Sequence, residues 1–117
     1  MPDHRFQEGI RLFNDREFFE CHEVLEELWT PMRGPHRLFL QALIHFAVAF
    51  YHQQRLNPAG AERQLRKALR KIEHYLPRYE GVDTATLHRE GEAALRRITA
   101  GETAAPPRFL LQGFLDT

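Results

Sequence analysis

Apolar residues recur along this chain with the three-to-four-residue spacing of amphipathic helices, and helix-breaking residues divide the pattern into five segments. Proline stands at the first helical position of two of these segments, after Gly34 and after Asn57. No stretch alternates apolar and polar residues as a half-buried strand does. The predicted helices cover about residues 3–13, 16–29, 35–56, 58–76 and 84–101. We therefore predict an all-α fold, a compact bundle of about five helices made of two helical hairpins plus a closing helix.

The same pattern divides the chain into a single helical domain over residues 1–101 and a C-terminal tail over residues 102–117. A chain of 117 residues fits one domain with one core. The tail ends in bulky apolar residues, namely Phe109, Leu110, Leu111, Phe114 and Leu115. Because exposed apolar side chains are unfavourable in water, we expect the tail to dock. It docks either on its own bundle or on a second copy of the chain, as in a homodimer.

Charge and cysteine content narrow the expected setting. The 16 Lys and Arg residues balance the 16 Asp and Glu residues, so the field of the whole chain attracts neither nucleic acid nor anionic lipid. The single cysteine, Cys21, excludes an internal disulfide, fits a reducing compartment and is expected to be a small core residue. The longest apolar run, residues 38–51, is too short to span a bilayer, and no signal peptide is visible. We expect a cytoplasmic protein without a membrane partner.

The predicted second helix places a histidine and a carboxylate among large apolar groups. On a helical projection, His22 and Glu26 lie between the apolar core face and Phe19, and Glu23 lies at the margin. A weak internal repeat at an offset of 43 residues aligns His22 with Leu65 and Glu26 with Leu69. Those leucines occupy core positions of the fourth helix. A buried carboxylate without a partner is costly, so Glu26 should have one.

The predicted third helix is apolar on nearly every side except for one polar row, formed by Gln41, His45 and His52. Two interpretations of this row stay open. Either the row is the one side of the helix that contacts water, or it meets the row of His22 and Glu26 inside the bundle and builds an internal polar site. Trp29 is expected in the core, and beside such a cluster it would form the floor of a pocket.

If the two rows meet, their chemistry again has two interpretations. One is a satisfied hydrogen-bond network or pocket lining, made of His22, Glu23, Glu26, Trp29, Gln41 and His52. The other is a divalent metal such as zinc, manganese or iron, with His22, Glu26 and His52 as ligands. Residues at i and i+4 share a helix face, so the first two side chains can reach one ion. Helical bundles hold metals in this way.

The predicted fourth helix is basic, with Arg63, Arg66, Lys67, Arg70 and Lys71. Such a run is typical of a solvated helix face, and binding of RNA or of an acidic partner is the alternative. No aromatic residue lies within this run, although stacking platforms are a common part of single-stranded nucleic-acid sites. Nucleic acid is therefore an unlikely partner.

A longer motif runs from Phe13 to Trp29 and reads F-N-x-x-x-F-F-E-x-H-E-x-L-E-x-x-W. It resembles the signature of domain-of-unknown-function family 309, a group of small prokaryotic proteins, and Leu40-Gln41-Ala42, His52 and Gly81-Val82-Asp83 add to the resemblance. The resemblance covers about residues 5–98. It implies a compact all-helical cytoplasmic domain with no established activity. The positions that match the motif are Glu20, His22, Glu23, Glu26, Trp29, Gln41 and His52, and His45 is not among them.

Three functions remain compatible with these features. The first, which we take as the main prediction, is a binding or interaction module for an unknown small molecule or protein, with a His/Glu/Gln polar cluster between the second and third helices. The second is a metal-dependent, hydrolase-like enzyme that uses Glu23 as a base beside the ligands His22, Glu26 and His52. The third is a nucleic-acid-associated protein that acts through the basic fourth helix. Whether the chain is an enzyme stays open.

Overall fold

Five α-helices account for most of the chain. The structure, a computed structural model, describes residues 4–109. Its helices are α1 (His4–Asn14), α2 (Phe18–Trp29), α3 (Pro35–Gln54), α4 (Pro58–Ile72) and α5 (Thr84–Thr99), and a short 3₁₀ turn, η1 (Glu73–Tyr75), follows α4. No β-strand occurs within residues 4–109. The predicted all-α bundle of about five helices is therefore confirmed.

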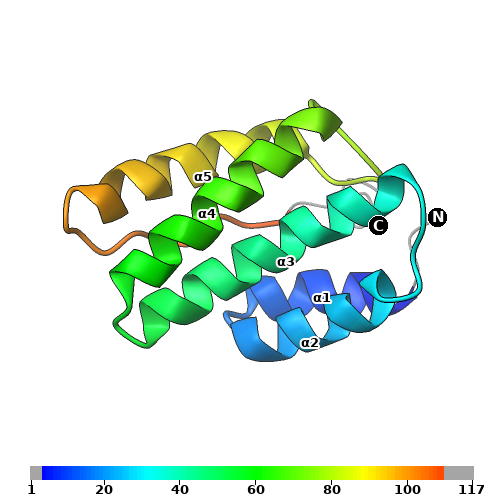
Figure 1. Ribbon diagram of the computed structural model, residues 1–117, viewed down its shortest axis with the longest axis horizontal. Helices are drawn as coiled ribbons and strands as arrows, with labels where there is room; N and C mark the ends of the chain where they lie inside the picture. The colour runs from blue at the N-terminus through cyan, green and yellow to red at the C-terminus, as the bar shows by residue number, and fades with distance from the viewer. Residues whose placement is uncertain (1–3, 110–117) are drawn as a thin grey trace.

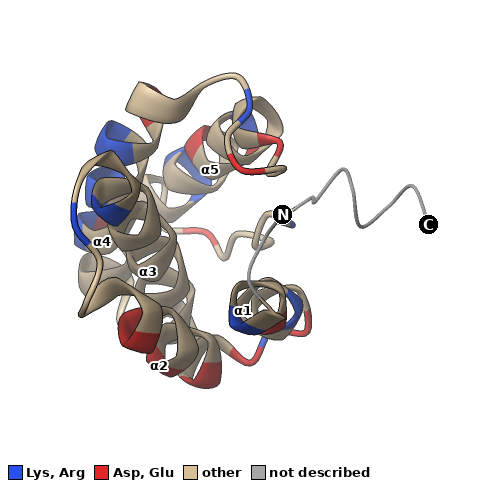
Figure 2. Ribbon diagram, turned by 90° about the vertical axis from the view of Figure 1, so that its right-hand side faces the viewer, with Lys and Arg blue, Asp and Glu red and all other residues tan. Residues whose placement is uncertain are grey.

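Consecutive helices lie side by side, so the bundle follows the order of the chain. The helices α1 and α2 form one antiparallel hairpin, α3 and α4 form a second, and α5 packs against α4 (Figure 1). Seen along the helix axes, the five helices make an open ring, and the chain after α5 lies in the opening between α5 and α1 (Figure 2). The ring is thus closed by the tail and not by a sixth helix.

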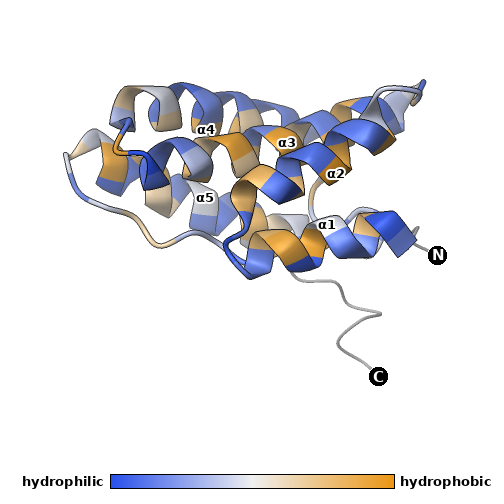
Figure 3. Ribbon diagram, turned by 90° about the horizontal axis from the view of Figure 1, so that it is seen from below, coloured by the Kyte–Doolittle hydropathy of each residue, from blue (hydrophilic) through white to orange (hydrophobic). Residues whose placement is uncertain are grey.

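The core is dominated by phenylalanine. Each helix carries hydrophobic and hydrophilic residues side by side, as expected for amphipathic helices that surround one core (Figure 3). No helix within residues 4–109 combines the length and the apolar character needed to cross a membrane. Among residues 4–109, the fully buried phenylalanines are Phe13, Phe18, Phe39, Phe46, Phe50 and Phe109. Because each aromatic ring buries a large apolar area, these six side chains supply much of the driving force for folding.

Short polar signals set the helix boundaries. Gly34 has φ +77°, a left-handed conformation that a glycine adopts without strain, and Pro35 then opens α3. At the start of α4 the side-chain oxygen of Asn57 accepts a hydrogen bond from the Gly60 amide at 3.1 Å. Asp83 caps α5 in the same way and accepts from the Thr86 amide at 3.0 Å and from the Thr86 hydroxyl at 2.8 Å.

Loss of the Asp83 cap is expected to destabilise the fold at neutral pH. Asp83→Ala should lower the free energy of unfolding by about 1 kcal/mol, measured by urea denaturation followed by circular dichroism. The hydrogen bonds from Thr86 lower the pKa of this carboxyl. The cap contribution of Asp83 is therefore present above the unfolded pKa, near 3.8, and is lost as the pH falls through the folded pKa.

Asp83→Asn is the matched control, because an asparagine oxygen caps a helix as well as a carboxylate does. It should keep most of the stability at pH 7 and remove this residue's share of the pH dependence. Equal losses for Asp83→Ala and Asp83→Asn would contradict the role assigned to the cap.

The described part of the tail, residues 102–109, lies on the bundle. Ala104 is 3% exposed and Phe109 is 1% exposed. The Phe109 ring stacks on the Phe13 ring of α1, with centroids 3.8 Å apart. The other apolar tail residues named in the sequence analysis, Leu110, Leu111, Phe114 and Leu115, lie outside the described residues.

Candidate functional site

The structure pairs His22 with Glu26 at the edge of α2. The Nε2 atom of His22 contacts the Oε2 atom of Glu26, one helical turn away. The side chain of His22 is 26% exposed and that of Glu26 is 48% exposed, so the pair lies at the surface and not inside the bundle. The other ring nitrogen of His22, Nδ1, is buried and has no hydrogen-bond partner among the described residues. Glu23, the candidate base, is exposed on the same helix.

Trp29 continues this side of α2 and contacts the start of α3. The guanidinium carbon of Arg37 lies 3.8 Å from the centre of the Trp29 ring, a cation–π contact. A hydrogen bond of 3.1 Å from the Arg37 Nε atom to the carbonyl of Met32 holds the guanidinium group in place. The indole Nε1 is buried without a partner among the described residues. Gln41 is half-buried on α3, and no hydrogen bond joins it to His22 or Glu26 in this part of the chain.

His45 lies against α4, not against α2. Its Nδ1–H donates to the Oε1 atom of Gln64 at 2.7 Å, and its Nε2 atom accepts from the Nζ atom of Lys71 at 3.2 Å. These two hydrogen bonds together require the neutral Nδ1–H tautomer. Burial is the main cause that lowers the pKa of His45, and repulsion from Lys71, Lys67 and Arg70 adds to it, against the Gln64 hydrogen bond. His45 is therefore a neutral group that positions Lys71.

His52 contacts the turn between α3 and α4. The Nδ2 atom of Asn57 lies 3.3 Å from the His52 Nδ1 atom, so the residue that caps α4 also bonds this imidazole. An added Cβ atom at Gly60 would lie 3.0 Å from the His52 ring carbon Cγ, which shows how closely α4 approaches the histidine. His45 thus has its partners on α4, and His52 has its partner at the cap of α4.

The predicted metal-ligand set is not assembled. His22 and Glu26 meet on α2, whereas His52 bonds Asn57, the residue that caps α4. Among residues 4–109, no three side chains of His, Cys, Asp or Glu lie together so that they could hold a metal ion. Within the described residues, His45 and His52 have their hydrogen-bond partners on α4 and at its cap and not on α2.

Cys21 offers no reactive thiol. Its side chain is fully buried in the core. Burial is the main cause that raises its pKa from 9.0 to about 12. A thiol that stays protonated is a poor nucleophile and a poor metal ligand.

Cationic side chains of α4 lie around Lys71, and within the described residues Lys71 forms no ion pair with a carboxylate. Arg63, Lys67 and Arg70 are exposed, and in this part of the chain only Arg66 of the basic run forms an ion pair, with Glu62 at 3.0 Å. Burial lowers the pKa of Lys71, and the nearby Lys67 and Arg70 lower it further. We define the basic face as Arg63, Lys67, Arg70 and Lys71 of α4 with His45 and Gln64.

His45 and the basic helix can both be identified in the sequence, but only as separate features. The signal that connects them is the antiparallel hairpin around the turn at Asn57. In an antiparallel hairpin, a residue about three helical turns before the connecting loop lies opposite residues about three helical turns after the loop. His45 has this position on α3. Gln64 and Lys71, seven residues apart on one side of α4, bracket that position.

This chain is similar to a family of domains of unknown function and to an uncharacterized bacterial protein. The family described as "Domain of unknown function (DUF309)" matches residues 6–64, half of the chain. The uncharacterized protein YpuF of Bacillus subtilis (strain 168) is 40% identical over 76 residues. That match covers 62% of this chain and 43% of YpuF, so the similarity spans less than half of the relative's length. The family match includes His22, Glu26, His45 and Gln64 but ends before Lys67.

Proposed function

This chain belongs to the DUF309 family of domains of unknown function, and we propose that it is a protein-interaction module that binds an acidic protein segment through the basic face of α4. One observation carries the proposal. Four cationic side chains lie on one side of α4 beside a neutral histidine, and no carboxylate pairs with any of the four within residues 4–109. An anionic partner relieves that repulsion.

The partially buried member of the face makes this more than a solvated helix surface. Lys71 is half-buried, and its ammonium group donates to His45 Nε2. A lysine held by a neutral imidazole keeps its charge at a fixed position without a neutralising group. The neighbouring Lys67 and Arg70 then add flexible charges around that point. This arrangement favours a partner that places carboxylates against the helix, because fixed donors lose less entropy on binding.

Two features support an acidic protein segment over nucleic acid as the partner. Residues 63–71 contain no aromatic side chain on which a base could stack. The charges repeat at spacings of four and three residues along one helix, which matches carboxylates at the same spacing on a facing helix. A second copy presents such a surface, because α2 carries Glu20, Glu23, Glu26 and Glu27 and no cation (Figure 2).

Charge reversal on the basic face tests the proposal. A decaglutamate peptide should bind the tag-free protein at low ionic strength in an isothermal titration, and the binding should weaken steeply with added salt. Lys67→Glu with Lys71→Glu should weaken it by about 10-fold or more, since each close charge pair is worth up to about 1 kcal/mol. The matched control, Arg89→Glu with Arg96→Glu on α5, changes the same net charge and should leave affinity nearly intact.

Two results would contradict the proposal. If both double variants lose the same affinity, binding follows net charge and not the basic face. If an RNA oligomer of equal charge binds more tightly than decaglutamate at the same salt concentration, and only the α4 variant loses that binding, the partner class is nucleic acid. Sedimentation of the protein at low and high salt concentration identifies the case in which a second copy supplies the acidic segment.

The remaining functional expectations have less support. A metal-dependent enzyme with His22, Glu26 and His52 as ligands needs the three side chains at one point, and the described structure keeps His52 at the α3–α4 turn. We therefore do not propose it. A cytoplasmic setting is proposed on the basis of the unpaired, buried Cys21.

A further inference from the structure

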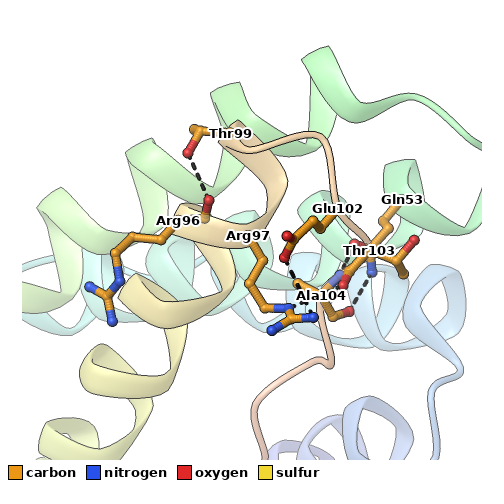
Figure 4. A network of polar contacts seen from close by, with 7 residues as sticks. All are labelled: Gln53, Arg96, Arg97, Thr99, Glu102, Thr103 and Ala104. Carbon is orange, nitrogen blue, oxygen red and sulfur yellow. Dashed lines mark hydrogen bonds and ion pairs between the residues drawn. The ribbon is translucent and has the colours of Figure 1, made fainter.

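The tail is held on the bundle by two side-chain amides that act as clamps. At α1, the Asn14 Nδ2 atom donates to the Phe109 carbonyl at 3.0 Å, and its Oδ1 atom accepts from the Phe109 amide at 2.8 Å. At the end of α3, Gln53 makes the same pair of bonds with Ala104, both at 2.9 Å. Figure 4 shows the Gln53 clamp and its surroundings. Each amide thus binds one tail residue through both of its backbone hydrogen-bonding groups.

Apart from the two clamps, the described tail forms few hydrogen bonds or ion pairs with the helices. No backbone-to-backbone hydrogen bond joins residues 103–109 to the rest of the described chain. Near the Gln53 clamp, Arg97 lies 3.5 Å from the Glu102 carboxylate and 3.4 Å from the Thr103 carbonyl (Figure 4). Pro106 and Pro107 lack an amide hydrogen, and they favour an extended backbone that requires no internal hydrogen bonds. The tail is therefore bound as an extended peptide, not as part of the helical framework.

The side chains of the tail fit defined positions. Ala104, Pro107 and Phe109 are buried, whereas Ala105 and Arg108 are exposed, and Ala104 and Phe109, five residues apart, are the anchors held by the two clamps. The Phe109 ring lies nearly parallel to the Phe13 ring, with an interplanar angle of 7°. It packs edge-on against the Phe46 ring, with the two ring centroids 6.0 Å apart. A small residue at the first clamp and an aromatic ring at the second clamp define the sequence that this surface accepts.

The surface is also wider than the segment that occupies it. A hollow of about 200 Å³ is lined by Gln53, Leu56 and Ile98. A second, open hollow of about 660 Å³ is lined by Ala93 and Arg97 of α5 and by Pro106 and Pro107 of the tail. Leu56 at the first hollow is 89% exposed. The first hollow adjoins the tail at Glu102 and Thr103, and the second adjoins it at Thr103 and at residues 105–108.

We propose that α1, α3 and α5 form a peptide-binding groove that accepts an extended segment with a small residue and, five positions later, a phenylalanine, and that residues 104–109 occupy it as a competing internal ligand. The groove lies between α5 and α1, away from the basic face of α4, and its evidence is independent of the function proposed above. A partner segment of the same chemistry binds when the tail leaves. Because the tail is covalently attached, its effective concentration is of millimolar order, so it competes strongly.

The test adds the tail back as a separate peptide. Phe109→Ala in the full chain removes the second anchor and leaves the groove residues unchanged. A fluorescent, C-terminally amidated peptide of residues 102–109 should bind this variant in an anisotropy titration and should raise its Tm. Binding to the wild-type protein should be about 100-fold weaker, as expected when a tethered competitor at millimolar effective concentration opposes a ligand of about 10 µM affinity.

Two controls show whether the clamps recognise the peptide. Adding Asn14→Ala to the Phe109→Ala variant should weaken binding by about 10-fold, because two hydrogen bonds to the peptide backbone are lost. A peptide with alanine in place of its phenylalanine should not bind. If Phe109→Ala is not folded by circular dichroism, Phe109→Leu serves instead, since leucine keeps an apolar side chain at this position but lacks the ring that stacks on Phe13. The proposal would be overturned if the peptide fails to bind the folded variant at millimolar concentration. It would also be overturned if neither the added Asn14→Ala substitution nor the alanine-substituted peptide changes the affinity.

Discussion

Replacing Phe13 by alanine is expected to lower the free energy of unfolding by about 3–5 kcal/mol, the range seen when a buried phenylalanine is truncated. Phe13 is 1% exposed and is the aromatic residue on which several elements meet. The centroid of its ring lies 5.0 Å from that of Phe18 of α2 and 6.2 Å from that of Phe50 of α3. The Phe13 ring also stacks on Phe109 of the tail. Guanidinium denaturation followed by circular dichroism measures the change.

Phe19→Ala is the matched control, because the same atoms are removed from a ring that is 44% exposed at the edge of α2. Its loss should stay below about 1 kcal/mol, since little apolar area returns to water. Similar losses for the two variants would show that α1, α2, α3 and the tail do not share the core described for Phe13.

Gly60→Val is expected to cost about 1–3 kcal/mol, the usual range for overpacking. A Cβ atom at this position would lie 2.6 Å from the Asn57 Nδ2 atom and 3.0 Å from the His52 ring. Valine therefore pushes Asn57 and His52 apart. Part of the loss comes from the Asn57 cap of α4, which contributes about 1 kcal/mol. Thermal unfolding at neutral pH gives the loss of stability.

Ala59→Val is the comparison for that substitution. Ala59 is exposed one position earlier in the same helical turn, so valine there tests helix propensity without the close contact. It should cost less than about 1 kcal/mol. If Gly60→Val is equally mild, His52 is not packed against α4, and the placement of the polar row on α3 would have to be revised.

The spacing of apolar residues and the positions of helix-capping and helix-breaking residues were sufficient to predict the helices. The proline and asparagine signals at positions 57 and 58 place the start of α4 correctly, because the cap and first-turn geometry depend on residues next to each other in the chain. The fourth helix is predicted over residues 58–76, whereas the α-helix ends at Ile72 and continues as the 3₁₀ turn η1 up to Tyr75. Helix ends often tighten in this way, with no clear sequence signal.

Side-chain partners across helices were harder to predict than the helices. His22 and Glu26 were identified as a pair because both lie on one helix at a fixed spacing. The partners of His45 depend on which neighbour faces one side of α3. Because α3 is apolar on most of its surface, its pattern does not distinguish the side packed on α2 from the side packed on α4. The clamps of Asn14 and Gln53 had no local signal, because each bonds backbone atoms far along the chain.

The titration of His45 tests the proposed acidic-segment site most directly. Long-range proton–nitrogen NMR spectra report the tautomer and the pKa of this imidazole in the free protein and with saturating decaglutamate. We expect the Nδ1–H tautomer at neutral pH and a pKa below the ordinary 6.5 in the free protein. Bound carboxylates should raise that pKa, because they offset the repulsion from Lys67, Arg70 and Lys71. An ordinary pKa that decaglutamate does not change would contradict the basic face as the binding site.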